Sequence, residues 1–194
     1  MENLNSMADD MLVSLYSNGN VKAFDVLLSR YRDKLYSYIS FIVRDREQTD
    51  DIFQETFVKA IVTLQKGAYT SNGKFGAWLT RIAHNLIIDS FRQEKSDNTV
   101  SSDSSQYDIL NDASLSDSNV EDEMIAGQTL EDVRRMIDML PDCQREVVFM
   151  RYYQDLSFKE IAQITGVSIN TALGRMRYAI LNMRRMSVES GILA

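Results

Sequence analysis

A single proline, Pro141, interrupts the 194 residues of the chain. Proline lacks a backbone N–H and clashes with the preceding turn of a helix, so a chain nearly free of proline permits long helices. No segment rich in valine, isoleucine and threonine alternates apolar with polar residues beside a hairpin dipeptide, which is the pattern of paired strands. The sequence therefore predicts an all-α fold.

Acidic residues are concentrated in one part of the chain. The formal net charge is −7, and residues 96–123 contain eight acidic residues, eight serines and no basic residue. Like charges repel each other and extend a chain that has no hydrophobic periodicity. We expect two small helical domains, at residues 1–95 and 129–194, joined by a flexible acidic linker at residues 96–128. The linker is either a solvated tether or a segment whose carboxylates occupy a basic channel of a partner.

The chain lacks the residues that several classes of protein need. Its only cysteine, Cys143, cannot form an internal disulfide, and its only histidine, His84, has no cysteine or histidine partner for a metal. No catalytic set or phosphate-binding loop can be assembled, so we expect neither an enzyme nor a bound cofactor or metal. The acidic start, MENLNSMADD, lacks the pattern of a signal peptide, and no run approaches the roughly 18 apolar residues of a membrane span. We expect a cytoplasmic protein that does not insert into a membrane.

The first domain contains four segments with helical periodicity. A short helix ends at Gly19, longer helices are expected over residues 21–43, 46–64 and 75–95, and a polar loop, QKGAYTSNGK, precedes the last. In the segment 21–43, apolar residues recur at every third or fourth position, which predicts one buried side of a helix. These residues are Phe24, Leu27, Leu28, Tyr31, Leu35, Tyr38, Ile39 and Ile42.

Two of these helices also carry polar residues at helical spacing. On the helix over residues 46–64, the outward stripe consists of Asp51, Gln54, Glu55 and Val58. Such a stripe is either an ordinary solvated face or a binding surface. On the helix over residues 75–95, the polar residues are Arg81, His84, Asn85, Asp89 and Arg92. We expect His84 to be a surface or packing residue and not a catalyst.

The second domain begins with the helical segment LEDVRRMIDML. Pro141 follows it and suits the first turn of a helix over residues 142–154, because a backbone N–H is not needed there. The sequence therefore predicts that the second domain is also helical.

The segment after this helix carries the signals of a helix-turn-helix. Ser157 and Glu160 match a capping box, which predicts that a helix starts at Phe158. Gly166 permits a sharp turn, and Ser168 can cap the next helix. Many DNA-binding proteins place the second helix of such a pair in the major groove, although similar helical hairpins are common in other proteins.

The last helix divides into an apolar and a basic side. The apolar side consists of Ala172, Met176, Ala179, Ile180 and Met183. The opposite side consists of Asn170, Gly174, Arg177, Leu181 and Arg185, flanked by Thr171, Tyr178 and Arg184. Arginine can pair with guanine edges or phosphates, and polar residues near the helix start can reach bases or backbone. Glycine costs about 1 kcal/mol relative to alanine in a helix interior, so Gly174 indicates close approach of DNA or close packing.

The order of these segments resembles one bacterial protein family. The segments are AFDVLLSRY, DDIFQETFVKA, FGAWLTRIAHNLIIDSFR, the linker, and LPDCQREVVFMRYYQDLSFKEIAQITGVSINTALGRMRYAILNMRR. In type and order they are similar to those of extracytoplasmic-function (ECF) sigma factors, the small two-domain members of the sigma-70 superfamily. The resemblance covers nearly everything outside the linker and the first few residues.

The resemblance implies that the first domain is sigma domain 2. It would dock on a coiled coil of the largest subunit of core RNA polymerase through Asp51, Gln54, Glu55 and Val58. The loop KGAYTSNGK would hold a base flipped from the −10 element, while the helix over residues 75–95 reads and melts the duplex. The implied −10 contacts are Tyr69, Asn72, Lys74, Arg81, Asn85, Asp89 and Arg92.

The resemblance implies that the second domain is sigma domain 4, with its last helix in the major groove of the −35 element. The implied contacts are Asn170, Thr171, Gly174, Arg175, Arg177 and Tyr178. Leu173 and Gly174 stand where many family members have a basic residue and a serine, so apolar or shape readout can substitute for hydrogen bonds there. The linker would run toward the RNA exit path.

The expected function is that of a sigma factor that binds core RNA polymerase and directs initiation at promoter DNA through its −10 and −35 elements. The family also implies a cognate anti-sigma factor, often membrane-anchored, that masks the polymerase-binding surfaces. Two alternatives stay open. A stand-alone helix-turn-helix regulator would leave the acidic stripe unused, and a sigma-like decoy would bind polymerase without supporting transcription.

Overall fold

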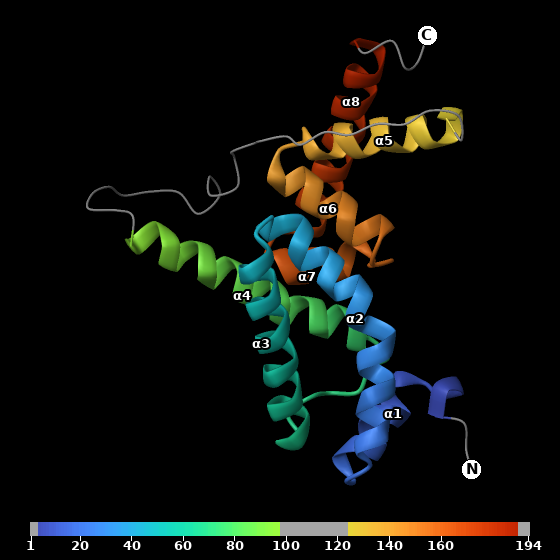
Figure 1. Ribbon diagram of the computed structural model, residues 1–194, viewed down its shortest axis with the longest axis vertical. Helices are drawn as coiled ribbons and strands as arrows, with labels where there is room; N and C mark the ends of the chain where they lie inside the picture. The colour runs from blue at the N-terminus through green and yellow to red at the C-terminus, as the bar shows by residue number, and fades with distance from the viewer. Residues whose placement is uncertain (1–3, 98–123, 190–194) are drawn as a thin grey trace. The chain divides into compact units, whose positions relative to one another are not determined.

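The computed structural model describes residues 4–97 and 124–189, and every regular element among them is a helix (Figure 1). The all-α prediction is confirmed. Contacts divide the chain into two units, residues 1–101 and 102–194. The helices of unit 1 are η1 (Leu4–Ser6), α1 (Asp9–Ser17), α2 (Val21–Val43), α3 (Arg46–Gln65) and α4 (Phe75–Asp97). Those of unit 2 are α5 (Met124–Asp138), α6 (Asp142–Tyr152), α7 (Phe158–Thr165) and α8 (Ile169–Glu189).

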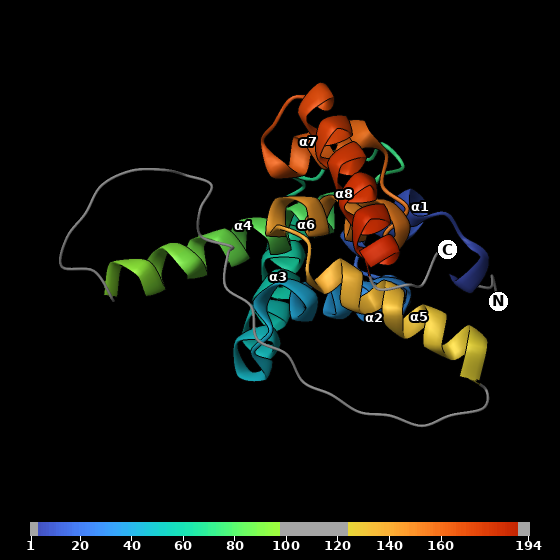
Figure 2. The same cartoon turned by 90° about the horizontal axis from the view of Figure 1, so that it is seen from above.

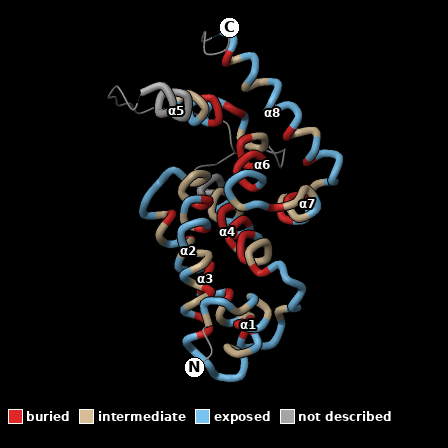
Figure 3. The backbone as a smooth tube through the Cα atoms, turned by 90° about the vertical axis from the view of Figure 1, so that its right-hand side faces the viewer, coloured by how far each residue is buried: buried red, intermediate tan, exposed pale blue. Residues whose placement is uncertain are grey.

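Helix α2 is the centre of unit 1, because α1, α3 and α4 all pack against it and α3 also packs against α4. Its buried side follows the predicted period, while its opposite side is exposed (Figure 3). Burying one large apolar side chain contributes about 2 kcal/mol, so a continuous stripe can hold several helices together. The largest fully buried apolar side chains among the described residues of unit 1 are Leu12, Leu27, Tyr38, Ile39, Leu64, Phe75, Leu79 and Ile87.

His84 is a packing residue of this core. It is 9% exposed, and its Nδ1 is hydrogen-bonded to the buried Tyr38 hydroxyl at 3.2 Å. The sequence placed it among the polar residues of its helix. However, His84 adjoins Ala83 and lies one turn before Ile87, and both of these are buried. A histidine can enter such a core when its ring nitrogen has a hydrogen-bond partner.

The N-terminal helix α1 is tied to α2 by ionic contacts. The Arg30 guanidinium donates to Asp9 Oδ1 at 2.5 Å and to the carbonyl oxygens of Asn5 and Met7 at 2.9 and 2.7 Å. The Tyr31 hydroxyl donates to the other oxygen of Asp9. These charge-assisted bonds fix the first turn of α1 against the middle of α2.

In unit 2, helices α5, α6 and α7 all pack on α8, and α6 also contacts α5 and α7. Figure 2 shows α7 and α8 crossing each other at one end of the unit. Arg145 joins α5 to α6, because its guanidinium donates to the Asp138 carbonyl oxygen at 3.1 Å and pairs with Asp142. The most deeply buried apolar residues of this core include Val147, Met150, Ile161, Ala172 and Ala179.

Some helix ends differ from the predicted ones. Helix α5 begins at Met124, inside the expected linker. Residues 124–128 contain no acidic residue and no serine, so they lack the composition that marks the linker. The rest of the expected linker, residues 98–123, lies outside the described residues. Pro141 occupies the N-cap of α6 and not its first turn. Helix α6 ends at Tyr152, since the chain must turn to bury Leu156, whose N–H donates to the Met150 carbonyl oxygen at 3.1 Å.

The predicted helix-turn-helix is present. Ser157 and Glu160 form the capping box, with the Ser157 N–H donating to the Glu160 carboxylate at 2.8 Å and the Glu160 N–H to Ser157 Oγ at 3.3 Å. Gly166 has a φ of 68°, the left-handed conformation that ends a helix and suits glycine. Ser168 caps α8, because its Oγ accepts the Thr171 N–H at 3.0 Å.

We expect Ser157→Ala to lower the free energy of unfolding of unit 2 by about 1 kcal/mol, because it removes the oxygen that caps α7. Thermal and denaturant unfolding of the full chain measure the change. Gln163→Ala, at an exposed position of the same helix, is the matched control and should leave the stability nearly unchanged. Equal unfolding curves for the native chain and Ser157→Ala would contradict the prediction.

Candidate nucleic-acid interface

The outward side of α3 is polar and exposed. Asp51, Gln54, Glu55 and Val58 all face solvent, and Val58 is 57% exposed despite being apolar. The opposite side of the helix packs into the core through Ile52, Phe57, Ala60 and Leu64. The Asp45 carboxylate caps the helix by accepting the Gln48 N–H at 2.8 Å. The sequence-predicted stripe is therefore brought together on one accessible face.

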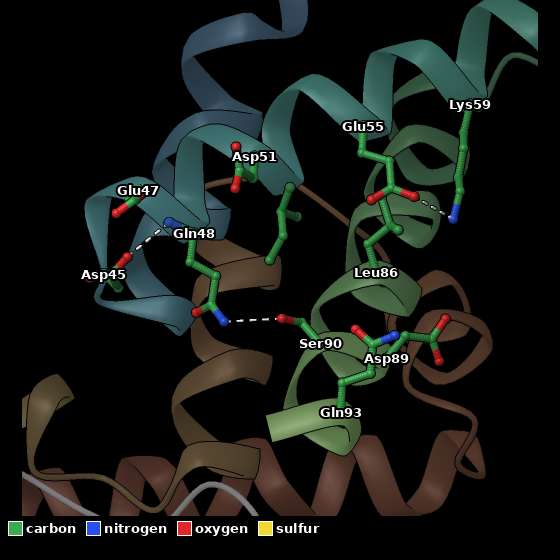
Figure 4. Close-up of a pocket in the computed structure, with 11 residues that line it drawn as sticks. Asp45, Glu47, Gln48, Asp51, Glu55, Lys59, Leu86, Asp89, Ser90 and Gln93 are labelled. Atoms are coloured by element: carbon green, nitrogen blue, oxygen red, sulfur yellow. Dashed lines mark hydrogen bonds and ion pairs between the residues drawn. The ribbon is translucent and has the colours of Figure 1, made fainter. Parts of the chain in front are cut away.

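An acidic groove lies between α3 and α4 (Figure 4). Its volume is about 580 Å³, and its charged lining residues are Asp45, Glu47, Asp51, Glu55, Lys59 and Asp89. Lys59 pairs with Glu55 at 3.1 Å, and the Gln48 side-chain amide donates to Ser90 Oγ at 3.0 Å across the groove. With five carboxylates and one ammonium group, the groove favours a basic partner.

The groove brings together residues that the sequence assigned to different surfaces. Asp51 and Glu55 come from the α3 stripe, whereas Asp89 comes from the polar stripe of α4. Asp45 and Glu47 were not singled out in the sequence, although Asp45 immediately precedes an apolar-periodic segment, which is the position of a cap. Asp89 thus extends the acidic surface of α3.

The remaining polar stripe of α4 faces solvent. Arg81, Asn85 and Arg92 are exposed, at intervals of four and seven residues that keep them on one side of the helix. Arg92 Nη1 lies 3.6 Å from Asp89 Oδ1, an exposed pair one turn apart. Two guanidinium groups and one amide on one face suit contacts with phosphates and base edges.

The loop over residues 66–74 connects α3 to α4 and carries three of the predicted −10 contacts, so we call it the −10 loop. Gly67 and Gly73 have φ values of 64° and 71°, so the loop turns at both ends through left-handed backbone that glycine adopts without strain. Asn72 and Lys74 are exposed, and Asn72 Oδ1 accepts the Lys74 N–H at 3.2 Å. The structure therefore presents these two predicted residues at the surface.

Tyr69, the third predicted residue of the loop, is half-buried and not exposed at the surface. Its ring packs on Trp78 and Phe75, with ring centroids 4.7 and 5.8 Å apart, and its hydroxyl is buried without a hydrogen-bond partner among the described residues. Burial, with the nearby carboxylates of Asp10 and Asp9, raises the pKa of Tyr69 to about 12. The side chain thus holds the loop against α4 and does not present its hydroxyl to solvent.

The outward side of α8 carries most of the predicted −35 residues. Asn170, Thr171, Arg177 and Tyr178 are exposed, while Gly174 and Arg175 are half-buried. The Thr171 hydroxyl is hydrogen-bonded to the Ser168 hydroxyl at 2.8 Å, so it supports the helix cap as well as facing solvent.

Apolar residues accompany these polar ones on the surface of α8. Leu173 is 44% and Leu181 46% exposed, and Ile180, predicted to be part of the apolar side, is 38% exposed. Ile180 lies at the edge of the buried side, which explains the partial exposure.

Packing among the described residues does not require a glycine at position 174. A Cβ atom built on it would meet no described atom within 4 Å. Of the two explanations that the sequence leaves open, close internal packing is therefore excluded for the described residues. The explanation that remains is close approach of DNA to the helix at this position.

The parts of the chain that the structure describes offer no group of three or more His, Cys, Asp and Glu residues that could hold a metal. None of the helices in those parts is long and apolar enough to cross a membrane.

Two family models match the two units. Sigma-70 region 2 matches residues 27–96, and Sigma-70, region 4 matches residues 130–175. The ECF RNA polymerase sigma factor SigW of Bacillus subtilis is 30% identical over 161 residues, which cover 81% of this chain and 85% of that protein. The chain belongs to the ECF sigma factor family. Members of this family are transcription initiation factors and not enzymes. The predicted family and the prediction that the chain is not an enzyme are both confirmed.

Solved structures show the same fold. The structure of CnrH in complex with the cytosolic domain of CnrY has a TM-score of 0.61 and 23% identity, and covers 93% of this chain and 97% of that chain. The sigma factor RpoE of Bartonella quintana, in complex with the anti-sigma factor NepR, has a TM-score of 0.60 and 22% identity, and covers 85% and 96%. The region 2 match of the ECF sigma factor includes α3, the −10 loop and α4 up to residue 96. The region 4 match ends at Arg175, before Arg177 and Tyr178.

Tyr69 gives a measurable pH dependence. Its pKa is about 12 in the folded chain against an ordinary 10.0, so the folded state keeps a proton that the unfolded chain releases in between. Tyr69 therefore contributes stability that is present below pH 10 and is lost as the pH rises toward 12. Tyr69→Phe keeps the ring and removes the titrating hydroxyl. We expect its melting temperature to fall less steeply than that of the native chain between about pH 9 and 11.

Tyr152→Phe is the control for this measurement, because Tyr152 is 67% exposed and lies in unit 2. Its melting temperature should follow that of the native chain across the same pH range. Identical slopes for Tyr69→Phe and the native chain would contradict the prediction.

Proposed function

We propose that this ECF sigma factor binds core RNA polymerase and directs initiation at promoters through −10 and −35 elements. In this proposal residues 1–95 form sigma domain 2, residues 129–194 form sigma domain 4, and residues 96–128 link them. One observation carries the proposal: an acidic face on α3 and an arginine-bearing face on α8 are both exposed, in separate units of the chain. A protein that bound only duplex DNA would not use the acidic face.

The polymerase-binding surface comprises Asp51, Gln54, Glu55 and Val58, extended by the groove toward Asp89. Complementary charge steers a basic surface toward it and fixes the orientation of binding. Exposed Val58 adds an apolar contact at the end of the stripe. A helix of the polymerase that carries basic side chains would fit this combination.

The −10 surface comprises the −10 loop and the outward side of α4. Asn72 and Lys74 would contact a base that leaves the stack, and Arg81, Asn85 and Arg92 the adjoining strand. Extruding a base costs a few kcal/mol, which contacts to the freed base and strand offset. Tyr69 supports this surface from behind, since its ring fixes the loop on α4.

The −35 surface lies on α8. Asn170 and Thr171 at its start would reach base edges or backbone, and Arg175, Arg177 and Tyr178 would contact phosphates or bases farther along. The four arginines of residues 161–188 give only weak, salt-sensitive binding by themselves. Tethering both units to polymerase raises the effective concentration of each at its own element, so weak contacts suffice together.

An anti-sigma factor is the second proposed partner. Bartonella quintana RpoE, which shares the fold of this chain, is held in a complex with its anti-sigma factor. We propose a cognate anti-sigma factor here, membrane-anchored as is common in the family, that covers the acidic groove. Its binding would then exclude polymerase.

We expect Asp51→Arg with Glu55→Arg to lower affinity for core polymerase at least about tenfold, because like charges would then oppose the basic partner. Promoter-dependent transcripts from genomic fragments should disappear with the same variant. Binding of fluorescently labelled chain to purified core polymerase, and transcription by that complex, measure the two effects.

The matched control is Asp25→Arg with Asp33→Arg, which makes the same charge change at exposed positions of α2. It should bind and transcribe like the native chain. Polymerase binding without any transcript would indicate the decoy, and specific duplex binding without polymerase would indicate the stand-alone regulator. Either result would overturn the proposal.

We expect Gly174→Ala to stabilise unit 2 by up to about 1 kcal/mol, because alanine is the better helix former and its Cβ meets open space. If DNA approaches the helix here, the same change weakens binding to the −35 element. Unfolding curves and gel-shift titration of polymerase bound to the selected promoter measure these opposite effects. Raised stability with unchanged promoter affinity would show that DNA does not approach Gly174.

A further inference from the structure

We propose that Asp10, in the first turn of α1, is a positioning residue for the −10 loop. Its Oδ2 accepts the Gly73 N–H at 2.9 Å, across 63 positions of sequence. Asp10 lies outside the region 2 match, which begins at residue 27, and outside the predicted site residues. The contact joins the N-terminal helix to the end of the loop that would meet the flipped base.

The −10 loop is thereby held at two points. The Tyr69 ring packs on Trp78 near the beginning of the loop, at 4.7 Å between ring centroids. The Asp10 carboxylate holds Gly73 near its end. Only Thr70, Ser71 and Asn72 lie between the two anchors, and all three are exposed. A three-residue segment with both ends fixed has few conformations left to lose.

Helix α1, which carries Asp10, is itself held in position by several contacts. The neighbouring Asp9 pairs with Arg30 at 2.5 Å and accepts the Tyr31 hydroxyl, and Leu12 and Val13 of the same helix are buried. Asp10 Oδ1 is buried too, so the carboxylate is partly enclosed and not a free surface charge. Its position relative to the loop is therefore set by the packing of α1 on α2.

This inference rests on the proposed function, because the loop is useful only if it meets promoter DNA. A loop that is already ordered loses less conformational entropy when a base enters it. It also keeps Thr70, Ser71 and Asn72 in one arrangement, which favours one base over the others. Asp10 would thus act on base discrimination at the −10 element while contacting no DNA itself.

The test compares Asp10→Ala with Asp10→Asn. Both changes remove a negative charge near DNA, but only the asparagine keeps an oxygen that can accept the Gly73 N–H. Asp33→Ala, at an exposed acidic position on α2, is the control for charge alone. If Asp10→Ala fails to fold, Asp10→Ser replaces it, because serine keeps a polar group in the first turn with a shorter reach.

Two measurements are made on each full-length variant. One is transcription by core polymerase from the strongest selected promoter and from its single-base variants in the −10 element, expressed as the ratio between them. The other is hydrogen exchange of the Gly73 amide in the free protein by NMR. We expect Asp10→Ala to lower the ratio about two- to tenfold, the effect of one hydrogen bond, and to speed Gly73 exchange. Asp10→Asn and Asp33→Ala should stay near the native values.

Equal loss of discrimination in Asp10→Ala and Asp10→Asn would assign the effect to charge and overturn the inference. An unchanged ratio or unchanged Gly73 exchange in Asp10→Ala would also overturn it, with the proposed function intact as long as the native chain discriminates. If the native chain supports no transcription, the proposed function fails, and the exchange of Gly73 alone then decides whether Asp10 holds the loop.

Discussion

Burial of the apolar side of α2 is the constraint on which unit 1 depends. Three helices pack on this one helix, so the direction of each is fixed by the side that it must bury. When α3 turns Ile52 and Phe57 inward, its acidic stripe has to face solvent, because residues about half a turn away lie on the opposite side. The same rule places the basic and amide groups of α4 outward. The positions of the proposed binding surfaces are thus a consequence of the core.

In unit 2, too, burial of one side of a helix determines which side faces solvent. The capping box and Gly166 set where α7 begins and ends, and the buried alanines of α8, Ala172 and Ala179, let it lie close to its neighbours. The exposed side of α8 carries arginines, and it carries polar residues near the helix start. A helix held by its neighbours on one side can enter a groove with the other, which is how helix-turn-helix proteins read DNA.

The proposed surfaces for polymerase and for DNA differ in charge, although the chain as a whole is acidic. The acidic excess lies in residues 96–123, and each of the flanking parts is within one charge of neutral. Within unit 1 five carboxylates line the groove, while Arg81 and Arg92 lie on the outward side of α4. Net charge therefore describes solubility and steering of the whole chain, whereas the sign of each face decides what it can bind.

Helical periodicity and caps were enough to predict the helices, the exposed stripe of α3, the cap at Ser157 and the polar side of α8, because these depend on hydrogen bonds and side-chain directions within a few turns. The same reasoning did not predict the surroundings of three side chains, those of Tyr69, His84 and Asp89. A loop has no period from which to read that the Tyr69 ring turns inward. A histidine enters a core only when a partner such as the Tyr38 hydroxyl, 46 positions away, is there to meet it.

The amino-acid order thus encodes which residues form helices and which sides of them are apolar, since each turn of helix can be read from its own neighbours. The acidic groove and the contact of Asp10 with Gly73 came from packing, because they join segments far apart in the chain. Such contacts depend on the angle and register at which helices meet. Those are set by how the side chains of the whole core fill space together, and no local stretch of sequence contains that information.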